Sequence, residues 1–463
     1  MKLHINEGAI KITEELEKRG YEAYVVGGAI RDTLLERPNK DWDVTTSAKP
    51  EEMLPLFEES FYDNAYGTVM VAGKHLKKQF NLAPETCEDE EIYDITTFRS
   101  EHGYSDKRRP DAVEWGKQIT DDLKRRDFTI NAMAAKIIKV LEAGMCEVEI
   151  IDPYQGKDDL KAGVIRAVGK AEERFEEDAL RILRAVRIAA QLGFKIEEET
   201  LNAIGKKSEN LKQISWERIG EEMRKILATE YAAQAILLMA STGILKVILP
   251  ELLQAKGVKQ AGHHIYDVFT HCVEALRACP SPDPVVRLAT LLHDIDKPVV
   301  LGEVGGKITF YNHEVSGART AKKIAERLKF SKNEQNRIFT LVRWHMFAYD
   351  SKMTDAAIRR FIRRVGKENI HDMMALRIGD RVGGGSKATS WRLTELQTRI
   401  GEQFYEPLSL KDLAIDGSEV MQILGIPPSR RVGEILNILF EEILEDSSKN
   451  TTEYLSLRVK ELV

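Results

Sequence analysis

The sequence is poor in the features that mark secreted, membrane-spanning or disulfide-stabilised proteins. Its cysteines (Cys87, Cys146, Cys272 and Cys279) form no CxxC pair, which disfavours a disulfide framework and a zinc ribbon. No apolar run approaches the roughly 20 residues that cross a bilayer, and the first residues lack the apolar segment of a secretory signal. We therefore expect a protein of the reducing cytoplasm that does not bind a membrane.

The chain also lacks a strong charge imbalance, a low-complexity tract and a long flexible linker. Lysine and arginine number 68 and aspartate and glutamate 74, which gives a formal net charge of −6. This balance does not exclude a nucleic-acid partner, because phosphate binding depends on local patches rather than on the total charge. With 463 residues, 43% of them hydrophobic, the chain is long enough for about three domains with ample cores.

A short stretch near the start of the chain carries phosphate and metal chemistry. An apolar run enters Gly27 and Gly28, Arg31 follows, and Asp41 and Asp43 then alternate on an expected strand. The glycines allow close approach of a triphosphate, which Arg31 can clamp. Carboxylates at i and i+2 of a strand share one face and suit Mg²⁺, which takes carboxylates together with substrate phosphates. Each motif alone is more often a plain turn or a solvated strand end, but their close succession predicts phosphoryl or nucleotidyl transfer.

Two further features belong to the same expected site. Strands are predicted at residues 24–26, 68–71 and 92–99, and Asp94 on the last of these is a candidate third carboxylate. An exposed strand residue is an equally good interpretation of Asp94. The second charged stretch, Arg125-Arg126-Asp127, precedes Asn131 and is suited to clamp a nucleotide, although a charge cluster at a helix start is the simpler interpretation of it in isolation.

These motifs together resemble one family. The Gly27-Gly28-x-x-Arg31-Asp32 to Asp41-x-Asp43 signature, with Arg125-Arg126-Asp127, is similar to class II tRNA nucleotidyltransferases, the bacterial CCA-adding enzymes and their poly(A) polymerase relatives. The similarity continues at residues 96–99, 104–106, 108–110 and 174–185. The resemblance implies that Arg126 and Asp127 contact the sugar and phosphates of a nucleotide, with Asn131 beside them.

The segment at residues 177–191 is predicted to form an amphipathic helix. Its polar side steps by three through Asp178, Arg181, Arg184 and Arg187, and periodicity alone favours a solvated, ion-paired face. The resemblance implies instead that Asp178 and Arg181 select the base, while Arg184 and Arg187 hold the base or triphosphate. A carboxylate accepts from an exocyclic amine and an arginine donates to a ring nitrogen, so the pair would take CTP and ATP and reject UTP and GTP.

Residues 99–110 match the flexible loop of the family. The resemblance implies that this loop is needed for the switch from C to A addition, which favours an enzyme that adds A, either as full CCA or alone.

A basic helix expected around residues 358–364 is a candidate contact to the tRNA backbone, although most such charge runs are solvated faces. The sequence assigns no role to the extra residues at 77–91 and indicates no oligomeric state.

The second half contains an ordered histidine and aspartate series. It comprises His271, His293, Asp294, His313, His345 and Asp380. Imidazoles together with carboxylates suit a divalent transition metal better than a structural zinc site. The order resembles the HD phosphohydrolase superfamily, which is found appended to some tRNA nucleotidyltransferases. In that pattern a glycine commonly precedes the lysine, whereas here Asp296 precedes Lys297, which is expected to make the local turn less permissive.

The sequence therefore predicts an α+β fold, with a mixed α/β nucleotidyltransferase head followed by an all-helical neck, body and HD region. The expected domains are the head at 1–137, a neck and body with the nucleotide-selecting helix at 138–255, the HD domain at 256–385, and a helical, tRNA-binding tail at 386–463.

The expected function is Mg²⁺-dependent addition of C, C and A to the 3′ end of tRNA, without a nucleic-acid template. In this hypothesis the tRNA 3′-hydroxyl attacks the α-phosphate of CTP or ATP, and Asp41, Asp43 and Asp94 are the catalytic carboxylates. Three alternatives remain open: an A-adding enzyme or poly(A) polymerase, an HD phosphohydrolase acting on RNA or nucleotides, and a nonenzymatic RNA-binding protein.

Overall fold

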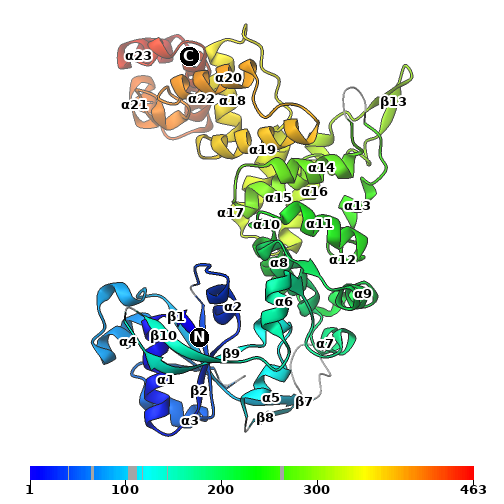
Figure 1. Ribbon diagram of the computed structural model, residues 1–463. Helices are drawn as coiled ribbons and strands as arrows, with labels where there is room; N and C mark the ends of the chain where they lie inside the picture. The colour runs from blue at the N-terminus through cyan, green and yellow to red at the C-terminus, as the bar shows by residue number, and fades with distance from the viewer. Residues whose placement is uncertain are drawn as a thin grey trace. The chain divides into compact units, whose positions relative to one another are not determined.

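The computed structural model describes residues 1–39, 41–63, 67–102, 112–116, 118–142, 144–260 and 265–462. The chain divides into two compact units (Figure 1). The first unit comprises residues 1–226 and 234–248, and the second comprises residues 227–233 and 249–463. Within the described ranges, no helix combines the length and the apolar character needed to span a membrane.

An eight-stranded sheet forms the centre of the first unit, with strand order β1-β10-β9-β2-β3-β6-β5-β4. Its strands are β1 (Lys2–His4), β2 (Ala23–Val26), β3 (Trp42–Thr46), β4 (Phe61–Asp63), β5 (Thr68–Ala72), β6 (Ile92–Thr97), β9 (Ala134–Val140) and β10 (Met145–Ile151). All neighbours are antiparallel except β3 and β6, which are parallel. The three strands expected from the sequence are confirmed. The sheet also includes β10, which ends at Ile151, beyond the expected end of the head at residue 137.

The central strands of the sheet carry apolar side chains at their buried positions, and burial of these side chains stabilises the sheet. All of β2 is buried, and α1 (Glu7–Lys18) packs its apolar side on β2 and β3. Asn6 begins α1 by accepting a hydrogen bond from the Gly8 amide at 2.7 Å. The remaining head elements are α2 (Gly28–Leu34), α3 (Pro50–Met53), α4 (Gly73–Phe80), α5 (Ile119–Lys124) and the hairpin of β7 (Arg99–His102) with β8 (Ala112–Trp115).

The unassigned segment at residues 77–91 is part of the head. Its first residues belong to α4, and Lys77 then holds the following loop together. The Lys77 ammonium donates to the carbonyl oxygen of Cys87 at 3.0 Å and pairs with Asp89. A Cβ at Gly73 would lie 2.1 Å from the carbonyl oxygen of Glu88, so this loop packs directly on the start of α4. The contacts give the segment a structural role.

Helices dominate the rest of the first unit. They are α6 (Gly156–Ala162), α7 (Ala171–Glu177), α8 (Leu180–Leu192), α9 (Glu198–Lys207), α10 (Trp216–Leu227), α11 (Ala232–Ser241) and α12 (Ile244–Ile248), with the short parallel pair β11 (Val164–Ile165) and β12 (Lys195–Ile196). The single helix expected at 177–191 is interrupted, because Asp178 has an extended backbone between α7 and α8. Its carboxylate accepts from the Leu180 amide at 2.9 Å.

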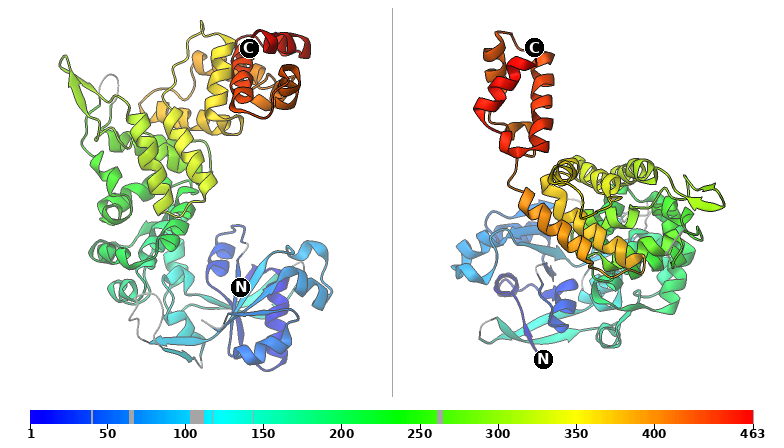
Figure 2. Two further views of the ribbon diagram at one scale, coloured as in Figure 1. Left: turned by 180° about the vertical axis from the view of Figure 1, so that it is seen from behind. Right: turned by 90° about the horizontal axis from the view of Figure 1, so that it is seen from above.

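Among its described residues, the second unit is helical apart from one hairpin. Its elements are α13 (Pro250–Gln254), α14 (Val268–Ala278), α15 (Pro284–Leu292), β13 (Gly302–Val304), β14 (Lys307–Thr309), α16 (His313–Arg327), α17 (Lys332–Trp344), α18 (Asp355–Val365), α19 (Ile370–Gly383), α20 (Trp391–Gln403), α21 (Gly417–Leu424), α22 (Arg430–Glu445) and α23 (Thr452–Glu461). The red C-terminal helices gather into a group of their own in both views of Figure 2. This group has its own apolar core, which includes Ile435, Leu439 and Phe440.

The basic helix expected around residues 358–364 is α18, and its arginines serve the fold. Arg359 is 5% exposed and donates to the Leu444 carbonyl oxygen at 2.9 and 3.0 Å. Arg363 pairs with Glu441 at 2.6 Å, and Arg360 pairs with Glu445. These contacts tie α18 to α22, so the charge run is explained by packing.

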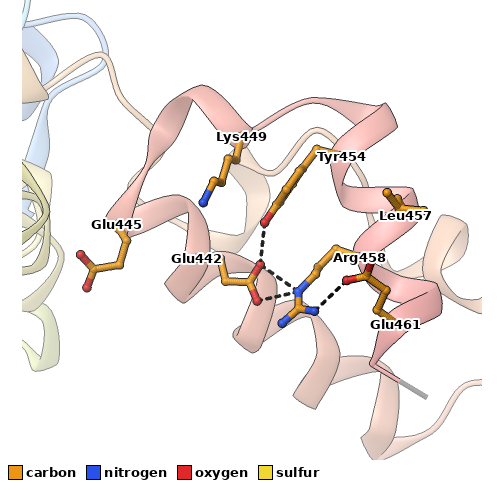
Figure 3. Close-up of a pocket in the computed structure, with 7 residues that line it drawn as sticks. All are labelled: Glu442, Glu445, Lys449, Tyr454, Leu457, Arg458 and Glu461. Atoms are coloured by element: carbon orange, nitrogen blue, oxygen red, sulfur yellow. Dashed lines mark hydrogen bonds and ion pairs between the residues drawn. The ribbon is translucent and has the colours of Figure 1, made fainter.

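A pocket of about 400 Å³ lies among the C-terminal helices. Figure 3 shows Tyr454 and Arg458 directed at Glu442, which accepts from them at 3.2 and 2.8 Å, while Arg458 also reaches Glu461 at 2.9 Å. The arginine of this pocket is therefore paired with two carboxylates.

Two glycines set the distance between α14 and α19. A Cβ at Gly383 would lie 2.6 Å from the Ala275 amide nitrogen, and one at Gly379 would lie 2.6 Å from the Ala275 carbonyl oxygen. The absence of side chains at these positions lets the two backbones touch.

We expect Gly383→Ala to destabilise the second unit by about 1–3 kcal/mol, because overpacking forces the two helices apart. Denaturant unfolding of the full chain measures the effect. Gly433→Ala in α22 is the matched control, since its Cβ meets nothing within 4 Å; this change should raise stability by about 0.5–1 kcal/mol. Equal unfolding midpoints for Gly383→Ala and the wild type would contradict the close packing.

Candidate active site and metal centre

The parallel pairing of β3 and β6 brings two of the predicted carboxylates together. Asp43 on β3 and Asp94 on β6 are partners in the strand register. Asp41 is exposed immediately before β3, where its carbonyl oxygen accepts from the Asn39 side chain at 2.9 Å. The three predicted catalytic residues therefore lie towards the N-terminal ends of two neighbouring parallel strands, a place in the head sheet that we call the carboxylate edge.

The electrostatics of these carboxylates favour a cation. Burial is the main cause that raises the pKa of Asp43 to about 6; Arg126 opposes it, and Asp94 and Asp41 raise the pKa further. Burial, and then Asp41, also raise the pKa of Asp94. Carboxylates that repel one another in a partly buried site are stabilised in their charged form by a divalent ion, so the donor set fits Mg²⁺.

The Gly27-Gly28 turn is required by the backbone. Gly27 has φ of +73°, and a Cβ there would lie 2.8 Å from Nη1 of Arg126 and 3.3 Å from Oδ2 of Asp43. The turn therefore packs directly against the carboxylate site. Gly28 starts α2, and Arg31 on that helix donates to both carboxylate oxygens of Asp32 at 2.9 and 2.7 Å.

A buried aspartate that the sequence reasoning did not single out orients the Arg125 and Arg126 side chains. Asp122 has no exposed surface, and it accepts from Arg125 at 2.6 Å and from Arg126 at 3.0 Å. The i to i+3 and i to i+4 spacing was the available signal for both pairs. Burial raises the pKa of Asp122, but the two arginines outweigh it and lower the pKa below its usual value.

Asp127 connects the head to the neck helix α8. It is 6% exposed and accepts from Arg184 at 2.7 Å, from the Asn131 side chain at 3.2 Å and from the Phe128 amide at 2.9 Å. Asn131 in turn accepts from Arg31 at 2.8 Å. Burial raises the pKa of Asp127, yet Arg184 and Arg181 lower it to about 2. Arg31, Asn131, Asp127 and Arg184 thus form one continuous set of hydrogen bonds.

The predicted base-selecting pair is held in place from both sides. Asp178 accepts from Nη2 of Arg218 at 2.8 Å through its Oδ2. Arg181 donates to Glu177 at 2.6 Å and to the carbonyl oxygens of Arg174 at 3.3 Å and Arg125 at 3.1 Å. Three of the five guanidinium donors are therefore used to fix Arg181 relative to the backbone.

Two supporting residues come from α10. Arg218 orients Asp178, and Glu222 pairs with Nε of Arg187 at 2.9 Å. The sequence alone assigns neither residue a role. Their contacts cross about 35 to 40 positions of the chain, so no local spacing could reveal them. The predicted polar face of α8 is consequently an ion-paired and partly buried surface.

Part of the predicted loop lies outside the residues that the structure describes. Of residues 99–110, the structure describes 99–102 as strand β7, and the motif residues Tyr104, Asp106, Arg108 and Pro110 lie outside the described residues. The loop prediction therefore stays a prediction.

The histidine and aspartate series converges in the second unit. The ligand atoms fall into two groups, each with all its atoms within 4.8 Å of one another: His271, His293 and Asp380, and Asp294, His313 and His345. The residues come from α14, α16 and α19 and from the ends of α15 and α17. Burial lowers the pKa of His293, yet Asp294 and Asp380 outweigh burial and raise it to about 10.

Backbone carbonyls orient three of these imidazoles. Nδ1 of His293 lies 2.7 Å from the Thr290 oxygen, and Nδ1 of His313 and of His345 lies 2.8 and 2.7 Å from the carbonyl oxygen three residues earlier. A ring that donates through Nδ1 leaves Nε2 as the acceptor, which is the form that binds a metal. The donor set therefore fits a divalent transition metal.

Asp296 does not strain the turn in which it replaces a glycine. It is absent from the residues with positive φ, so this position does not need a glycine. The side chain is 5% exposed and accepts from the Thr320 hydroxyl at 3.1 Å. The expected loss of turn flexibility therefore has no consequence for the backbone at Asp296.

Three family models match the chain. They are the poly A polymerase head domain at 23–166, a probable RNA and SrmB-binding site of polymerase A at 193–256, and a putative tRNA nucleotidyltransferase domain 2 at 308–458. The head domain match contains all the carboxylates of the first site.

Two curated relatives are CCA-adding enzymes. The enzyme of Geobacillus stearothermophilus is 41% identical over 245 residues, which cover 53% of this chain and 54% of that protein. The enzyme of Ligilactobacillus salivarius is 32% identical over 98% of this chain and 96% of that protein. The chain thus spans about half the length of the first relative and nearly all of the second.

Solved structures agree with this kinship. The crystal structure of the Bacillus stearothermophilus CCA-adding enzyme in complex with CTP has a TM-score of 0.70 and 26% identity, and covers 98% of this chain and 97% of that one. A Thermotoga maritima CCA-adding enzyme complexed with tRNA shares the fold, with a TM-score of 0.58, 19% identity and full coverage of both chains. The near-complete alignment with the Ligilactobacillus enzyme and the head domain match place this chain in the CCA-adding enzyme family of class II nucleotidyltransferases.

Proposed function

We propose that the protein is a CCA tRNA nucleotidyltransferase that adds C, C and A from CTP and ATP to the 3′ end of tRNA in the cytoplasm. The observation that carries the proposal is the continuous network from the carboxylate edge to α8. Asp43 lies beside Arg126 at the Gly27 turn. Arg31, on the helix that begins after this turn, is joined through Asn131 and Asp127 to Arg184 of α8. Catalysis and base selection thus share one rigid frame.

Enzymes of this family depend on a metal ion, and we propose Mg²⁺ for this site. Asp41 and Asp43 would hold it, with Asp94 alongside. The ion would lower the cost of charge on the attacking 3′-hydroxyl and on the leaving pyrophosphate. The protein's own contribution is to hold the carboxylates on adjacent strands and to present Arg31 and Arg126 to the triphosphate.

Base selection in this proposal follows from hydrogen-bond polarity. The carboxylate of Asp178 accepts from the exocyclic amine of cytosine or adenine, and Arg181 donates to the unprotonated ring nitrogen beside it. Uracil and guanine present a carbonyl and a ring N–H at these points, which leaves both side chains unpaired. A partly buried site with unpaired polar groups rejects such a base strongly.

The nearest alternative is an enzyme that adds only A. Purified protein, a tRNA lacking CCA, and CTP alone, ATP alone or both nucleotides distinguish the two functions. Incorporation of C from CTP alone supports CCA addition, and its absence with retained A addition supports the alternative. No incorporation of either nucleotide would contradict both.

We expect Asp43→Asn to lower nucleotide incorporation at least about a thousandfold, because the site loses the charge that holds the metal. Removing Mg²⁺ with a chelator should have the same effect on the wild type. Radiolabelled CTP incorporation into tRNA measures both. Asp158→Asn is the control, since Asp158 is exposed on α6 and should keep full activity.

We expect Arg218→Ala to lower kcat/KM for CTP and ATP about tenfold and to raise relative incorporation of UTP and GTP, because Asp178 loses its orienting partner. Steady-state rates with each of the four nucleotides measure the change. Lys225→Ala on the same helix removes only an exposed pair with Glu221 and should leave selection unaltered. Unchanged discrimination in Arg218→Ala would count against the positioning role.

A second candidate function is metal-dependent phosphohydrolysis in the second unit. The buried convergence of imidazoles and carboxylates at His293 and Asp294 favours it. Reciprocal variants separate the two activities: Asp43→Asn should remove nucleotide incorporation and keep phosphate-ester hydrolysis, while His293→Ala should do the reverse. Loss of incorporation in His293→Ala alone would show that the first activity depends on the second centre.

A further inference from the structure

The buried carboxylate of Asp122 lies between two parts of the proposed nucleotide site: Arg126 at the carboxylate edge and the turn that supports Arg181. We propose that Asp122 is a positioning residue that couples these parts, so that one aspartate sets both the affinity for the triphosphate and the choice of base. This inference rests on the proposed nucleotide addition by the head, and it adds a residue that acts on that reaction through its neighbours.

The two oxygens of Asp122 serve different arginines. Oδ1 accepts from Nε and Nη2 of Arg125 at 3.0 and 2.6 Å, and Oδ2 accepts from Nε and Nη2 of Arg126 at 3.2 and 3.0 Å. Both oxygens are therefore needed as acceptors. An amide at this position has one acceptor oxygen and presents an N–H group to the other arginine, so it can hold only one of the two guanidinium groups.

One of these pairs directs Arg126 at the carboxylate edge. Asp122 binds the Nε and Nη2 side of the guanidinium, which leaves Nη1 to face the Gly27 turn. A Cβ at Gly27 would lie 2.8 Å from this Nη1 and 3.3 Å from Oδ2 of Asp43. Arg126 is thus fixed beside the place of the triphosphate in the proposed function, and fixing it in advance lowers the entropic cost of binding.

The other pair holds the backbone turn that supports the base-selecting arginine. Arg125 follows α5 directly, and its carbonyl oxygen accepts from Nη2 of Arg181 at 3.1 Å. The preceding carbonyl oxygen, of Lys124, accepts from Nη1 of Arg174 at 3.3 Å. Because the side chain of Arg125 is tied to Asp122, the turn keeps both carbonyl oxygens directed at these guanidinium groups. Asp122 therefore acts on Arg181 through the backbone of Arg125.

The helix that carries Asp122 is anchored by its apolar side. Ile119 is 7% exposed and Leu123 has no exposed surface, and both belong to a core cluster that includes Tyr24 and Phe98. Burial of these side chains holds α5 on the head without help from the carboxylate. A substitution of Asp122 should therefore release the arginines and leave the helix in place.

Steady-state incorporation of each of the four nucleotides into tRNA by the full chain tests the coupling. Arg126→Met should raise KM for CTP and ATP about tenfold and keep discrimination against UTP and GTP. Arg125→Met should relax that discrimination about tenfold with little change in KM for CTP and ATP. Asp122→Asn should do both. Adding Asp122→Asn to Arg126→Met should raise KM no further, because the two residues act on the triphosphate as one unit.

Asp121→Asn is the matched control. Asp121 is the neighbour of Asp122 on α5, is half-buried, and takes part in no ion pair among the residues that the structure describes, so its substitution should change neither quantity. Thermal unfolding of each variant reports whether the head is folded.

Two kinds of result would overturn the coupling. The first is a change in only one of the two quantities in Asp122→Asn, or unchanged discrimination in Arg125→Met. The second is an equal loss of kcat with all four nucleotides at a lowered unfolding temperature, which would show a purely structural role. Absence of C and A incorporation by the wild type would instead contradict the proposed function.

Discussion

Buried carboxylates are the constraint on which both sites of this protein depend. A charged carboxylate removed from water must be paired, hydrogen-bonded or bound to a metal. The chain meets this requirement in two ways. Asp122 and Asp127 are neutralised by arginines and so become rigid structural supports. Asp43 lies beside other carboxylates, and Asp294 lies in a cluster of groups that could hold a metal ion.

The difference between aspartates that are paired with arginines and aspartates that are not explains how the parts of the head are held together. Asp127 is saturated by Arg184, Asn131 and the Phe128 amide, so it fixes the distance between the carboxylate edge and α8. Asp43, in contrast, has a raised pKa beside two other carboxylates. The arginine-paired aspartates hold the geometry of the head, whereas the raised pKa of Asp43 shows that its charge lacks a full counter-charge.

The same division appears in the second unit. Close contact of α14 with α19 through Gly379 and Gly383 provides a rigid frame. Within that frame, Nε2 of His313 and Nε2 of His345 both face Oδ1 of Asp294, and neither nitrogen has a hydrogen-bond partner among the described residues. Local motifs such as His293-Asp294 indicated metal binding, but they could not reveal that the two oxygens of Asp294 serve different groups of histidines.

Local chemistry in the sequence determined the expected strands, the carboxylates Asp41 and Asp43, the glycine turn, and the histidine series, because each depends on residues close together in the chain. It also pointed to the family through motifs that lie in order. Tertiary structure alone decided the break at Asp178, the orienting contact of Arg218, and the use of the basic run in α18 for packing. These features depend on partners that lie tens of residues away, and only folding brings such partners within hydrogen-bond distance.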